Sequence, residues 1–191
     1  GSVKICIDGV AVVLRHYLRG GFIARWLRDQ YFWLGKRRTR AFREWDMLNA
    51  AVDLGLPVSR PLGVCVWRNG LIYRAAIMTA FLENTETLAE RLIHSQLKRD
   101  HWYQLGVLLK RLHGHRFFHA DLNANNLLID REDQFYIIDF DKARIMSRTG
   151  DWQWGPLYRL QRSLDKIDRK QQLHYESDDW QALMDGYQSS S

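Results

Sequence analysis

The amino-acid sequence predicts an α+β fold in two lobes, a β-rich one followed by a mainly helical one. In residues 1–83, apolar runs of strand length alternate with turn signals such as Asp8-Gly9. In residues 84–191, apolar residues recur mostly at the spacing of a helix. A chain of 191 residues is long enough to bury a substantial core, so each lobe can have an apolar interior.

Two hairpins and one helix are expected in the β-rich lobe. Asp8-Gly9 and Arg68-Asn69-Gly70 are turn sequences, and each separates two runs of β-type residues. After Thr39, apolar side chains recur at helical spacing until Gly55, where a helix would end. We therefore expect strands at Val3–Ile7, Ala11–Arg15, Val64–Trp67 and Leu71–Phe81, and a helix at Thr39–Leu54.

Four helices and a further hairpin are expected in the helical lobe. The strongest helical pattern, Asp100–His113, is followed by Gly114, which we expect to end it as a left-handed cap. The hairpin would join Leu127–Ile129 to Phe135–Ile138 around the polar turn Asp130–Gln134. The other helices are expected at Thr85–Leu92, Leu157–Ile167 and Ser177–Tyr187.

Composition narrows the class of protein. No run of 18 apolar residues occurs, so no membrane-spanning helix is predicted, and the start lacks the pattern of a signal peptide. Cys6 and Cys65 lie in apolar, strand-like runs without zinc-binding spacing, so we expect buried, reduced thiols and a cytoplasmic location. We also expect the chain to begin inside a longer protein.

Positive charge is concentrated in one stretch. Between Arg15 and Arg43 there are nine Lys or Arg residues and one acid, whereas the whole chain has a net charge of +6. Such a field attracts anions, and nucleic acid, a phospholipid surface and an acidic sugar all fit it; a solvated basic face is the alternative. Arg19–Arg38 also contains aromatic residues, which suit either a membrane interface or a lobe core. They include Phe22, Trp26, Phe32 and Trp33.

The residues that point to chemistry cluster in His119–Asp141. Four positions match the pattern H-x-D-L-x-x-x-N of a phosphoryl-transfer site, in which the aspartate, here Asp121, orients the acceptor hydroxyl and accepts its proton. Asp139 begins a run that stands where such sites have a metal-binding Asp-Phe-Gly motif. The expected hairpin would place Asp139 beside Asn126, and an amide and a carboxylate oxygen suit Mg²⁺ bound to ATP.

Taken singly, these residues would more often belong to turns or helix caps. Their combination with a hairpin and with a two-lobed layout predicts a bilobal protein-kinase-like fold. His119 is expected to have a supporting, structural role in the loop. Asp141 either adds to the metal or substrate contacts or lies in a solvated turn.

A site of this kind also needs a cation for the donor phosphates and an acid that orients it. Arg15 stands at the strand position of that cation, where lysine is usual, and Glu44 on the following helix is the expected acid. Lys36 and Arg19 remain alternative cations, and Glu44 could instead be an exposed partner of Arg40 one helical turn away. The glycine-rich phosphate loop that precedes this strand in such folds is absent from the sequence.

Departures from the protein-kinase pattern disfavour a protein acceptor. Ala120 replaces the arginine that receives an activation-loop phosphate, and Asp141 replaces the glycine of the metal motif. No Ala-Pro-Glu sequence follows, and the segment left to hold a peptide is short. A small-molecule or glycan acceptor is therefore expected.

Seven short runs, taken in order, carry a family resemblance. They are Leu14-Arg-His-Tyr, Arg19-Gly-Gly, Arg40-x-Phe-x-Glu44, Gly55-Leu-Pro-Val58, His119-Ala-Asp-Leu-Asn-Ala124, Ile138-Asp-Phe-Asp-Lys142 and Arg162-Ser-Leu-Asp-Lys166. Together they resemble the 3-deoxy-D-manno-octulosonic acid (Kdo) kinase family, relatives of the lipopolysaccharide core heptose kinases. The resemblance covers roughly Ala11 to Lys166.

The resemblance implies a Gram-negative bacterial kinase that uses ATP and Mg²⁺ to phosphorylate O4 of a Kdo residue on Kdo-lipid A, in inner-core lipopolysaccharide biosynthesis. It implies a peripheral protein on the cytoplasmic face of the inner membrane, with an anionic lipid surface rather than nucleic acid as its partner. Two alternatives remain open. One is another glycan or small-molecule kinase of this fold, such as a heptose or aminoglycoside phosphotransferase, and the other is a catalytically silent module that binds anionic lipid or RNA.

Overall fold

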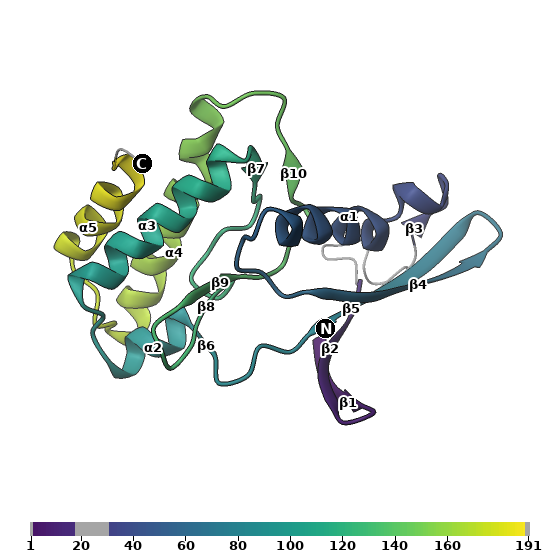
Figure 1. Cartoon of the computed structure of the whole chain (residues 1–191), viewed down its shortest axis with the longest axis horizontal. Coiled ribbons are helices and arrows are strands. Elements are labelled where there is room, and N and C mark those ends of the chain that lie inside the picture. The colour runs from purple at the N-terminus through teal and green to yellow at the C-terminus, as the bar shows by residue number, and fades with distance from the viewer. Residues whose placement is uncertain (1, 18–30, 190–191) are drawn as a thin grey trace. The chain divides into compact units, whose positions relative to one another are not determined.

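A computed structural model describes residues 2–17 and 31–189 of the chain. The chain forms two compact units. Residues 1–82 contain the long strands, and residues 83–191 contain most of the helices together with short strands (Figure 1). The α+β architecture predicted from the sequence is confirmed.

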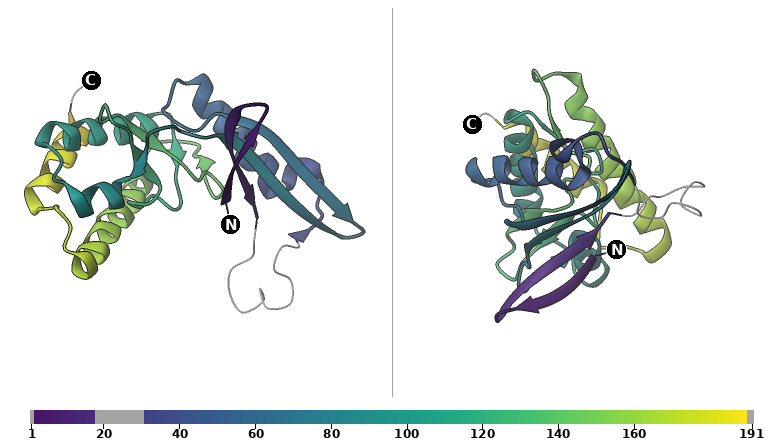
Figure 2. Two further views of the ribbon diagram at one scale, coloured as in Figure 1. Left: turned by 90° about the horizontal axis from the view of Figure 1, so that it is seen from below. Right: turned by 90° about the vertical axis from the view of Figure 1, so that its right-hand side faces the viewer.

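The first unit is built on a five-stranded antiparallel sheet in which β5 is central. Strand β5 pairs with β2, β3 and β4, and β1 pairs with the outer side of β2 (Figure 2). At the turn between β1 and β2, Asp8 and Gly9 have φ angles of 48° and 78°, the left-handed conformation that a two-residue hairpin turn requires. The strands are β1 (Ser2–Ile7), β2 (Val10–His16), β3 (Tyr31–Phe32), β4 (Pro61–Asn69) and β5 (Ile72–Ala80).

One helix, α1 (Arg40–Asp53), packs against β4 and β5 of this sheet. It follows a short 3-10 turn, η2 (Lys36–Arg38), and begins where the Thr39 hydroxyl accepts a hydrogen bond from the Phe42 N–H at 3.4 Å. It ends at Asp53, and Gly55, two residues further on, has a φ of 65° and donates its N–H to the Val52 carbonyl at 2.9 Å. The helix predicted at Thr39–Leu54 is confirmed, because a capping residue and a left-handed glycine mark its two ends.

The two cysteines are free and exposed, so the prediction of buried thiols was wrong. Cys6 lies on β1, an edge strand whose residues are mostly exposed. Cys65 alternates along β4 with half-buried valines and so shares the face of Trp67, which is 52% exposed. An apolar run does not reveal which faces of its strand are covered.

The second unit combines four helices with three short strand pairings. Strand β7 pairs with β10, and β8 lies between β6 and β9. The helices are α2 (Leu88–His94), α3 (Arg99–Gly114), α4 (Trp154–Gln171) and α5 (Ser177–Gln188), with a 3-10 turn, η3 (Asp151–Gln153), before α4. The strands are β6 (Glu86–Thr87), β7 (Phe117–Phe118), β8 (Leu127–Ile129), β9 (Phe135–Ile137) and β10 (Arg144–Ile145).

Helices α3 and α5 lie side by side and touch backbone to backbone (Figure 1). A Cβ atom on Gly106 of α3 would lie 2.0 Å from the Leu183 carbonyl oxygen of α5. A Cβ atom on Gly186 of α5 would lie 2.0 Å from the Tyr103 carbonyl oxygen. Only glycine fits at both positions, because real Cβ atoms do not approach backbone atoms this closely.

Several helix boundaries differ from the prediction, and α4 runs from Trp154 to Gln171 rather than over 157–167. Helix α2 begins at Leu88 rather than at residue 85, because Thr87 and Glu90 form a capping box and β6 precedes them. Helix α3 continues through Gly114, and the left-handed residue after it is Arg116, with a φ of 64° and an N–H that donates to the His113 carbonyl at 2.8 Å. The capping role expected for Gly114 was therefore wrong.

His113, near the end of α3, is fully buried. Its Nδ1 atom and the Tyr187 hydroxyl share a hydrogen bond of 2.8 Å, and its ring packs edge-on against Trp152. Burial, and secondarily the nearby His119, lower the pKa of His113 to about 4. Within residues 2–17 and 31–189, no helix is both long and apolar enough to cross a bilayer.

Candidate active site

Strands β8 and β9 form the hairpin that the sequence predicts. Leu127 pairs with Ile137 and Ile129 with Phe135, and all four side chains are buried. The pairing extends one step beyond the strands, because the Ile138 N–H donates to the Asn126 carbonyl at 3.0 Å.

This extra hydrogen bond places Asn126 beside the residue that precedes Asp139. The two residues expected to bind metal therefore stand at the same end of the hairpin.

The loop that carries Asp121 is held in place by buried neighbouring side chains and by hydrogen bonds from two side-chain amides. Leu122 and Ala124 are fully buried, whereas the Asp121 side chain is 53% exposed. The backbone carbonyl of Asp121 accepts hydrogen bonds from the side-chain amides of Asn123 at 2.9 Å and Asn126 at 2.8 Å. The loop thus holds its shape while it presents the Asp121 carboxylate to solvent.

His119 links the two ends of the site. Its ring is 1% exposed, packs edge-on against Phe140, and makes a 3.0 Å hydrogen bond from Nε2 to the Ile138 carbonyl. A carbonyl only accepts, so Nε2 carries the proton, and burial lowers the pKa of His119, which keeps the ring neutral. His119 therefore ties the Asp121 loop to the residue before Asp139.

The residues at the hairpin end fit a Mg²⁺ ion that is shared with a nucleotide. The Asn126 amide nitrogen is held by the Asp121 carbonyl, so the amide oxygen faces away from that carbonyl. Asp139 has a left-handed φ of 66°, and its Oδ1 atom accepts from the Asp141 N–H at 3.4 Å. In the described part of the chain, no three His, Cys, Asp or Glu side chains gather into a metal site. Mg²⁺ needs few protein ligands when phosphates supply others, so this sparse set suits it.

Arg15 and Glu44 meet within the first unit. Glu44 is 2% exposed on α1, and its carboxylate accepts hydrogen bonds from the Arg15 guanidinium on β2 and from the Tyr17 hydroxyl. The Arg15 side chain is 23% exposed. Glu44 is thus a buried partner of Arg15 and Tyr17 rather than an exposed residue on the surface of α1. Tyr17 was not singled out in the sequence, because a tyrosine at a strand end has no distinguishing pattern.

Of the alternative phosphate cations, Lys36 is exposed, and its Nζ atom lies 5.0 Å from the centre of the Phe42 ring. Arg19, the alternative noted in the basic stretch, lies outside the described residues, as do Arg25, Arg28, Phe22 and Trp26. Phe32 is exposed, and Trp33 is partly buried against Tyr73.

Arg159 was missed by sequence reasoning. It lies on α4, and its Nη1 atom is 3.7 Å from the Asp121 Oδ1 atom. The same helix contacts the loop again at Ser163, whose hydroxyl accepts the Ala124 N–H at 3.2 Å. The only sequence signal was that Arg159 precedes Arg162 by about one helical turn.

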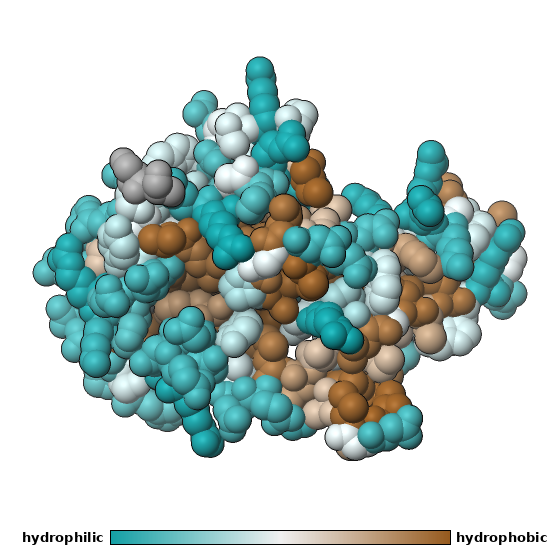
Figure 3. Space-filling view, viewed as in Figure 1, coloured by the Kyte–Doolittle hydropathy of each residue, from teal (hydrophilic) through white to brown (hydrophobic). Residues whose placement is uncertain are grey.

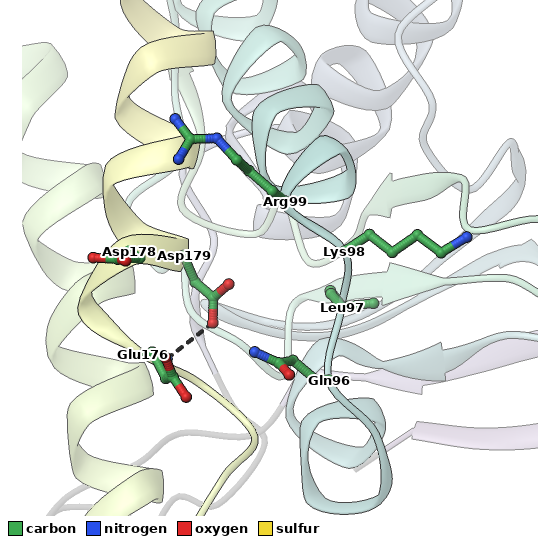
Figure 4. Close-up of a pocket in the computed structure, with 7 residues that line it drawn as sticks. All are labelled: Gln96, Leu97, Lys98, Arg99, Glu176, Asp178 and Asp179. Carbon is green, nitrogen blue, oxygen red and sulfur yellow. Dashed lines mark hydrogen bonds between the residues drawn. The ribbon is translucent and has the colours of Figure 1, made fainter.

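A polar pocket elsewhere in the second unit contains none of the predicted site residues. Figure 4 shows that its acids come from the start of α5 and its cations from the start of α3. The Asp179 carboxylate accepts from the Glu176 N–H at 2.9 Å as part of a capping box, so these acids serve the helix end. The lining residues are Gln96, Leu97, Lys98, Arg99, Glu176, Asp178 and Asp179.

Comparison with protein families gives a match over nearly the whole chain. The model described as "Lipopolysaccharide kinase (Kdo/WaaP) family" matches residues 3–187. The chain belongs to this family. It is therefore a member of a group of kinases, enzymes that transfer a phosphoryl group to a hydroxyl acceptor.

Relatives of this Kdo/WaaP family member are named 3-deoxy-D-manno-octulosonic acid kinase. One from Xylella fastidiosa (strain M23) is 40% identical over 175 residues, which cover 92% of this chain and 70% of the relative. One from Mannheimia succiniciproducens is 36% identical over 186 residues, covering 95% of this chain and 77% of the relative. These matches confirm the family that the sequence resembles.

A solved structure shows the same fold. The Cydia pomonella granulovirus kinase PK-1 aligns with a TM-score of 0.51 over 73% of this chain, at 15% identity. This chain spans 46% of the viral kinase, less than half of its length. The likeness confirms the predicted kinase-like fold.

Proposed function

We propose that this protein transfers the γ-phosphoryl group of ATP to a hydroxyl of a Kdo residue, O4, on Kdo-lipid A. The observation that carries the proposal is the β8–β9 hairpin, which gathers Asp121, Asn126 and Asp139 at one end in an arrangement suited to phosphoryl transfer. The names of the relatives support Kdo as the acceptor sugar. Such a reaction would belong to inner-core lipopolysaccharide biosynthesis in a Gram-negative bacterium.

In the proposed reaction, Asp121 accepts a hydrogen bond from the acceptor hydroxyl and takes its proton as the hydroxyl oxygen bonds to the γ-phosphorus. The bond between that phosphorus and the β,γ-bridging oxygen breaks, and ADP leaves. Asp121 suits this role because its carboxylate is half exposed on a loop fixed by Leu122 and Ala124. Asn126 and Asp139 would hold the metal ion. Mg²⁺-ATP supplies the phosphoryl group and the positive charge that neutralises its oxygens.

Arg15 would bind donor phosphate oxygens, and Glu44 would orient it. A guanidinium has five N–H donors in a planar fork, so one arginine can contact a carboxylate and a phosphate at the same time. Tyr17 contributes to the same carboxylate, which makes the orientation of Glu44 rigid. Arginine in place of lysine remains charged and can contact phosphate through two parallel hydrogen bonds.

We further propose that the protein acts as a peripheral protein on the anionic cytoplasmic face of the inner membrane. Phe32, Leu34 and Leu71 are 66%, 69% and 77% exposed, and we call them the apolar tip. They lie together because Phe32 pairs with Ile72 and the Trp33 N–H donates to the Leu71 carbonyl at 2.8 Å. The exposed Lys36, Arg37 and Arg38 follow directly along the chain.

Apolar side chains beside cations suit the interface of an anionic bilayer. Brown atoms at the β4–β5 end of the first unit in Figure 3 show apolar surface on that face. The substrate would itself be a lipid, so docking to the bilayer would bring the enzyme to its acceptor.

The test is a phosphoryl-transfer assay with Mg²⁺-ATP and Kdo-lipid A, read by mass spectrometry of the lipid. We expect one added phosphate, lost in Asp121→Asn, with the unfolding transition of that variant unchanged because the side chain is half exposed. Phosphorylation of a heptose acceptor instead would assign another glycan. ATP binding without transfer to any sugar would overturn the enzymatic proposal.

A further inference from the structure

Arg159 lies beside the proposed catalytic carboxylate without being tightly bound to it. Its Nη1 atom is 3.7 Å from the Asp121 Oδ1 atom, and the two side chains are 49% and 53% exposed. This separation is longer than a hydrogen bond, and an exposed ion pair of this kind adds little to stability. The pair nevertheless places a permanent positive charge next to the oxygen that would receive the acceptor proton.

The backbone that carries Arg159 is fixed relative to the Asp121 loop. Leu160 and Leu164 of α4 are fully buried, and the Ser163 hydroxyl accepts the Ala124 N–H at 3.2 Å. Arg159 lies one helical turn before Ser163, on the same side of the helix. Its charge therefore stays close to the loop, while its long side chain can turn toward an incoming group.

Positive charge continues from Arg159 along one face of α4. The face consists of exposed residues that recur every three or four positions over roughly 16 Å, and we call it the basic face. Of the two acids in this part of α4, Asp168 is engaged elsewhere, because it accepts the Leu173 N–H at 2.8 Å. The basic face comprises Arg159, Arg162, Lys166 and Lys170.

We propose that Arg159 binds an anionic group of the acceptor beside the hydroxyl that Asp121 orients, and that the basic face accommodates further negative charge of the same acceptor. The inference rests on the proposed function, because it names the part of the acceptor that this site recognises. A guanidinium binds a carboxylate through two parallel hydrogen bonds. Arg159 is thus a specificity-determining residue for acidic sugars.

The chemistry of Kdo fits the spacing of the pair. Its carboxylate is attached to C2 of the sugar ring, and O4 stands two ring bonds away on C4. A hydroxyl at Asp121 and a carboxylate at Arg159 would therefore belong to one sugar. On binding, the Asp121 carboxylate would exchange its contact with Arg159 for the acceptor hydroxyl. The Arg159 guanidinium would exchange its contact with Asp121 for the Kdo carboxylate. A neutral sugar has a hydroxyl for Asp121 but no carboxylate for Arg159.

Arg159 could instead bind the phosphoryl group during its transfer. Steady-state kinetics distinguish that role from binding of the acceptor carboxylate. The experiment measures kcat and KM of the intact protein with Kdo-lipid A and with the same lipid carrying a Kdo carboxamide. For Arg159→Gln we expect KM for the acid acceptor to rise about tenfold, KM for ATP to stay within about twofold, and the preference for acid over amide to disappear. Arg159→Lys should restore part of the preference, because it keeps the charge but not the fork.

The control is Arg169→Gln on the same helix, where the side chain donates to the Asp165 carbonyl at 3.1 Å. This variant should keep the wild-type preference for the acid acceptor. If Arg159→Gln behaves like Arg169→Gln, the proposal is overturned. A loss of kcat that is equal for acid and amide acceptors would assign Arg159 to the phosphoryl group and also overturn it.

Binding without ATP separates this inference from the proposed reaction. Calorimetry with free Kdo reports on Arg159 whether or not phosphate is transferred. If the wild type fails to phosphorylate Kdo-lipid A but Kdo binding is lost in Arg159→Gln, the reaction is wrong and the binding site stands. Equal binding of Kdo to the wild type and to Arg159→Gln would refute the site itself.

Discussion

Replacing Gly106 by alanine should destabilise the helical unit, although alanine is the better helix former. The new Cβ atom would lie 2.0 Å from the Leu183 carbonyl oxygen, 2.7 Å from the Tyr187 nitrogen and 2.9 Å from the Leu183 carbonyl carbon. An ordinary contact needs at least 3.4 Å, so α3 and α5 would have to separate by 1.4 Å. All three neighbours are backbone atoms, which cannot rotate away.

The magnitude follows from two opposing effects. Overpacking of a tight interior costs about 1–3 kcal/mol and sometimes more, whereas the change from glycine to alanine in a helix gains about 1 kcal/mol. Because several backbone contacts are violated at once, we expect Gly106→Ala to lower the free energy of unfolding by about 2 kcal/mol. With an m-value of roughly 2 kcal/mol/M, the urea midpoint falls by about 1 M.

Gly114 provides a matched control on the same helix. A Cβ atom there meets nothing within 4 Å, so Gly114→Ala should gain about 0.5–1 kcal/mol from helix propensity alone. Urea unfolding followed by far-UV circular dichroism measures both variants. If Gly106→Ala unfolds at the same urea concentration as Gly114→Ala, the argument from close backbone contact is refuted.

Three further predictions concern the pair in the β-rich unit, the buried histidine and the apolar tip. Glu44→Gln should raise KM for ATP about tenfold in steady-state assays, because a neutral amide no longer holds the Arg15 guanidinium by charge. His113, with a folded pKa near 4 and an unfolded pKa of 6.5, takes up its proton only on unfolding between these values. Its stabilising effect is complete above pH 6.5 and falls by up to about 3 kcal/mol toward pH 4, as chemical unfolding at several pH values would show. The double variant Phe32→Ser, Leu71→Ser should sediment less with anionic vesicles, because two of the most exposed apolar side chains are removed.

Each of these predictions has a control. An acceptor KM that rises with the ATP KM in Glu44→Gln would indicate general damage rather than loss of a phosphate contact. His94 is exposed, so His94→Gln should keep the wild-type pH profile, whereas His113→Gln should flatten it. Ile145, on β10, is 45% exposed, and Ile145→Ser should leave vesicle binding unchanged. Equal vesicle binding by the wild type and the double variant would contradict a membrane role for the apolar tip.

Features encoded locally were predictable from the sequence. The β8–β9 hairpin follows from two short apolar runs around a polar turn, and α1 follows from helical spacing bounded by Thr39 and Gly55. The fold and the family followed from these elements and from the motif runs. The roles of Asp121, Asn126 and Asp139 remain predictions that the proposed assays test.

Features that depend on distant parts of the chain were not predictable. Nothing in the local sequence of Gly106 shows that the Leu183 carbonyl passes over it, and nothing near Asp121 shows that Arg159 approaches it. The exposure of Cys6 depends on what covers the edge of the sheet. The left-handed conformation of Arg116 likewise reflects where the chain must turn into β7, rather than a preference of arginine.

The pairing of β7 with β10 has a consequence for the order in which the protein assembles. Phe118 pairs with Arg144, so everything between them, including Asp121 and Asp139, forms a closed loop with a second hairpin inside it. Contacts over such short stretches close quickly during folding, and the entropy of ordering the loop is lost then rather than on nucleotide binding. The contact between Ala124 and Ser163 spans 39 positions and needs a residue that is synthesised after Arg144. The nascent chain would thus form the hairpin end with Asn126 and Asp139 before α4 brings Arg159 to Asp121.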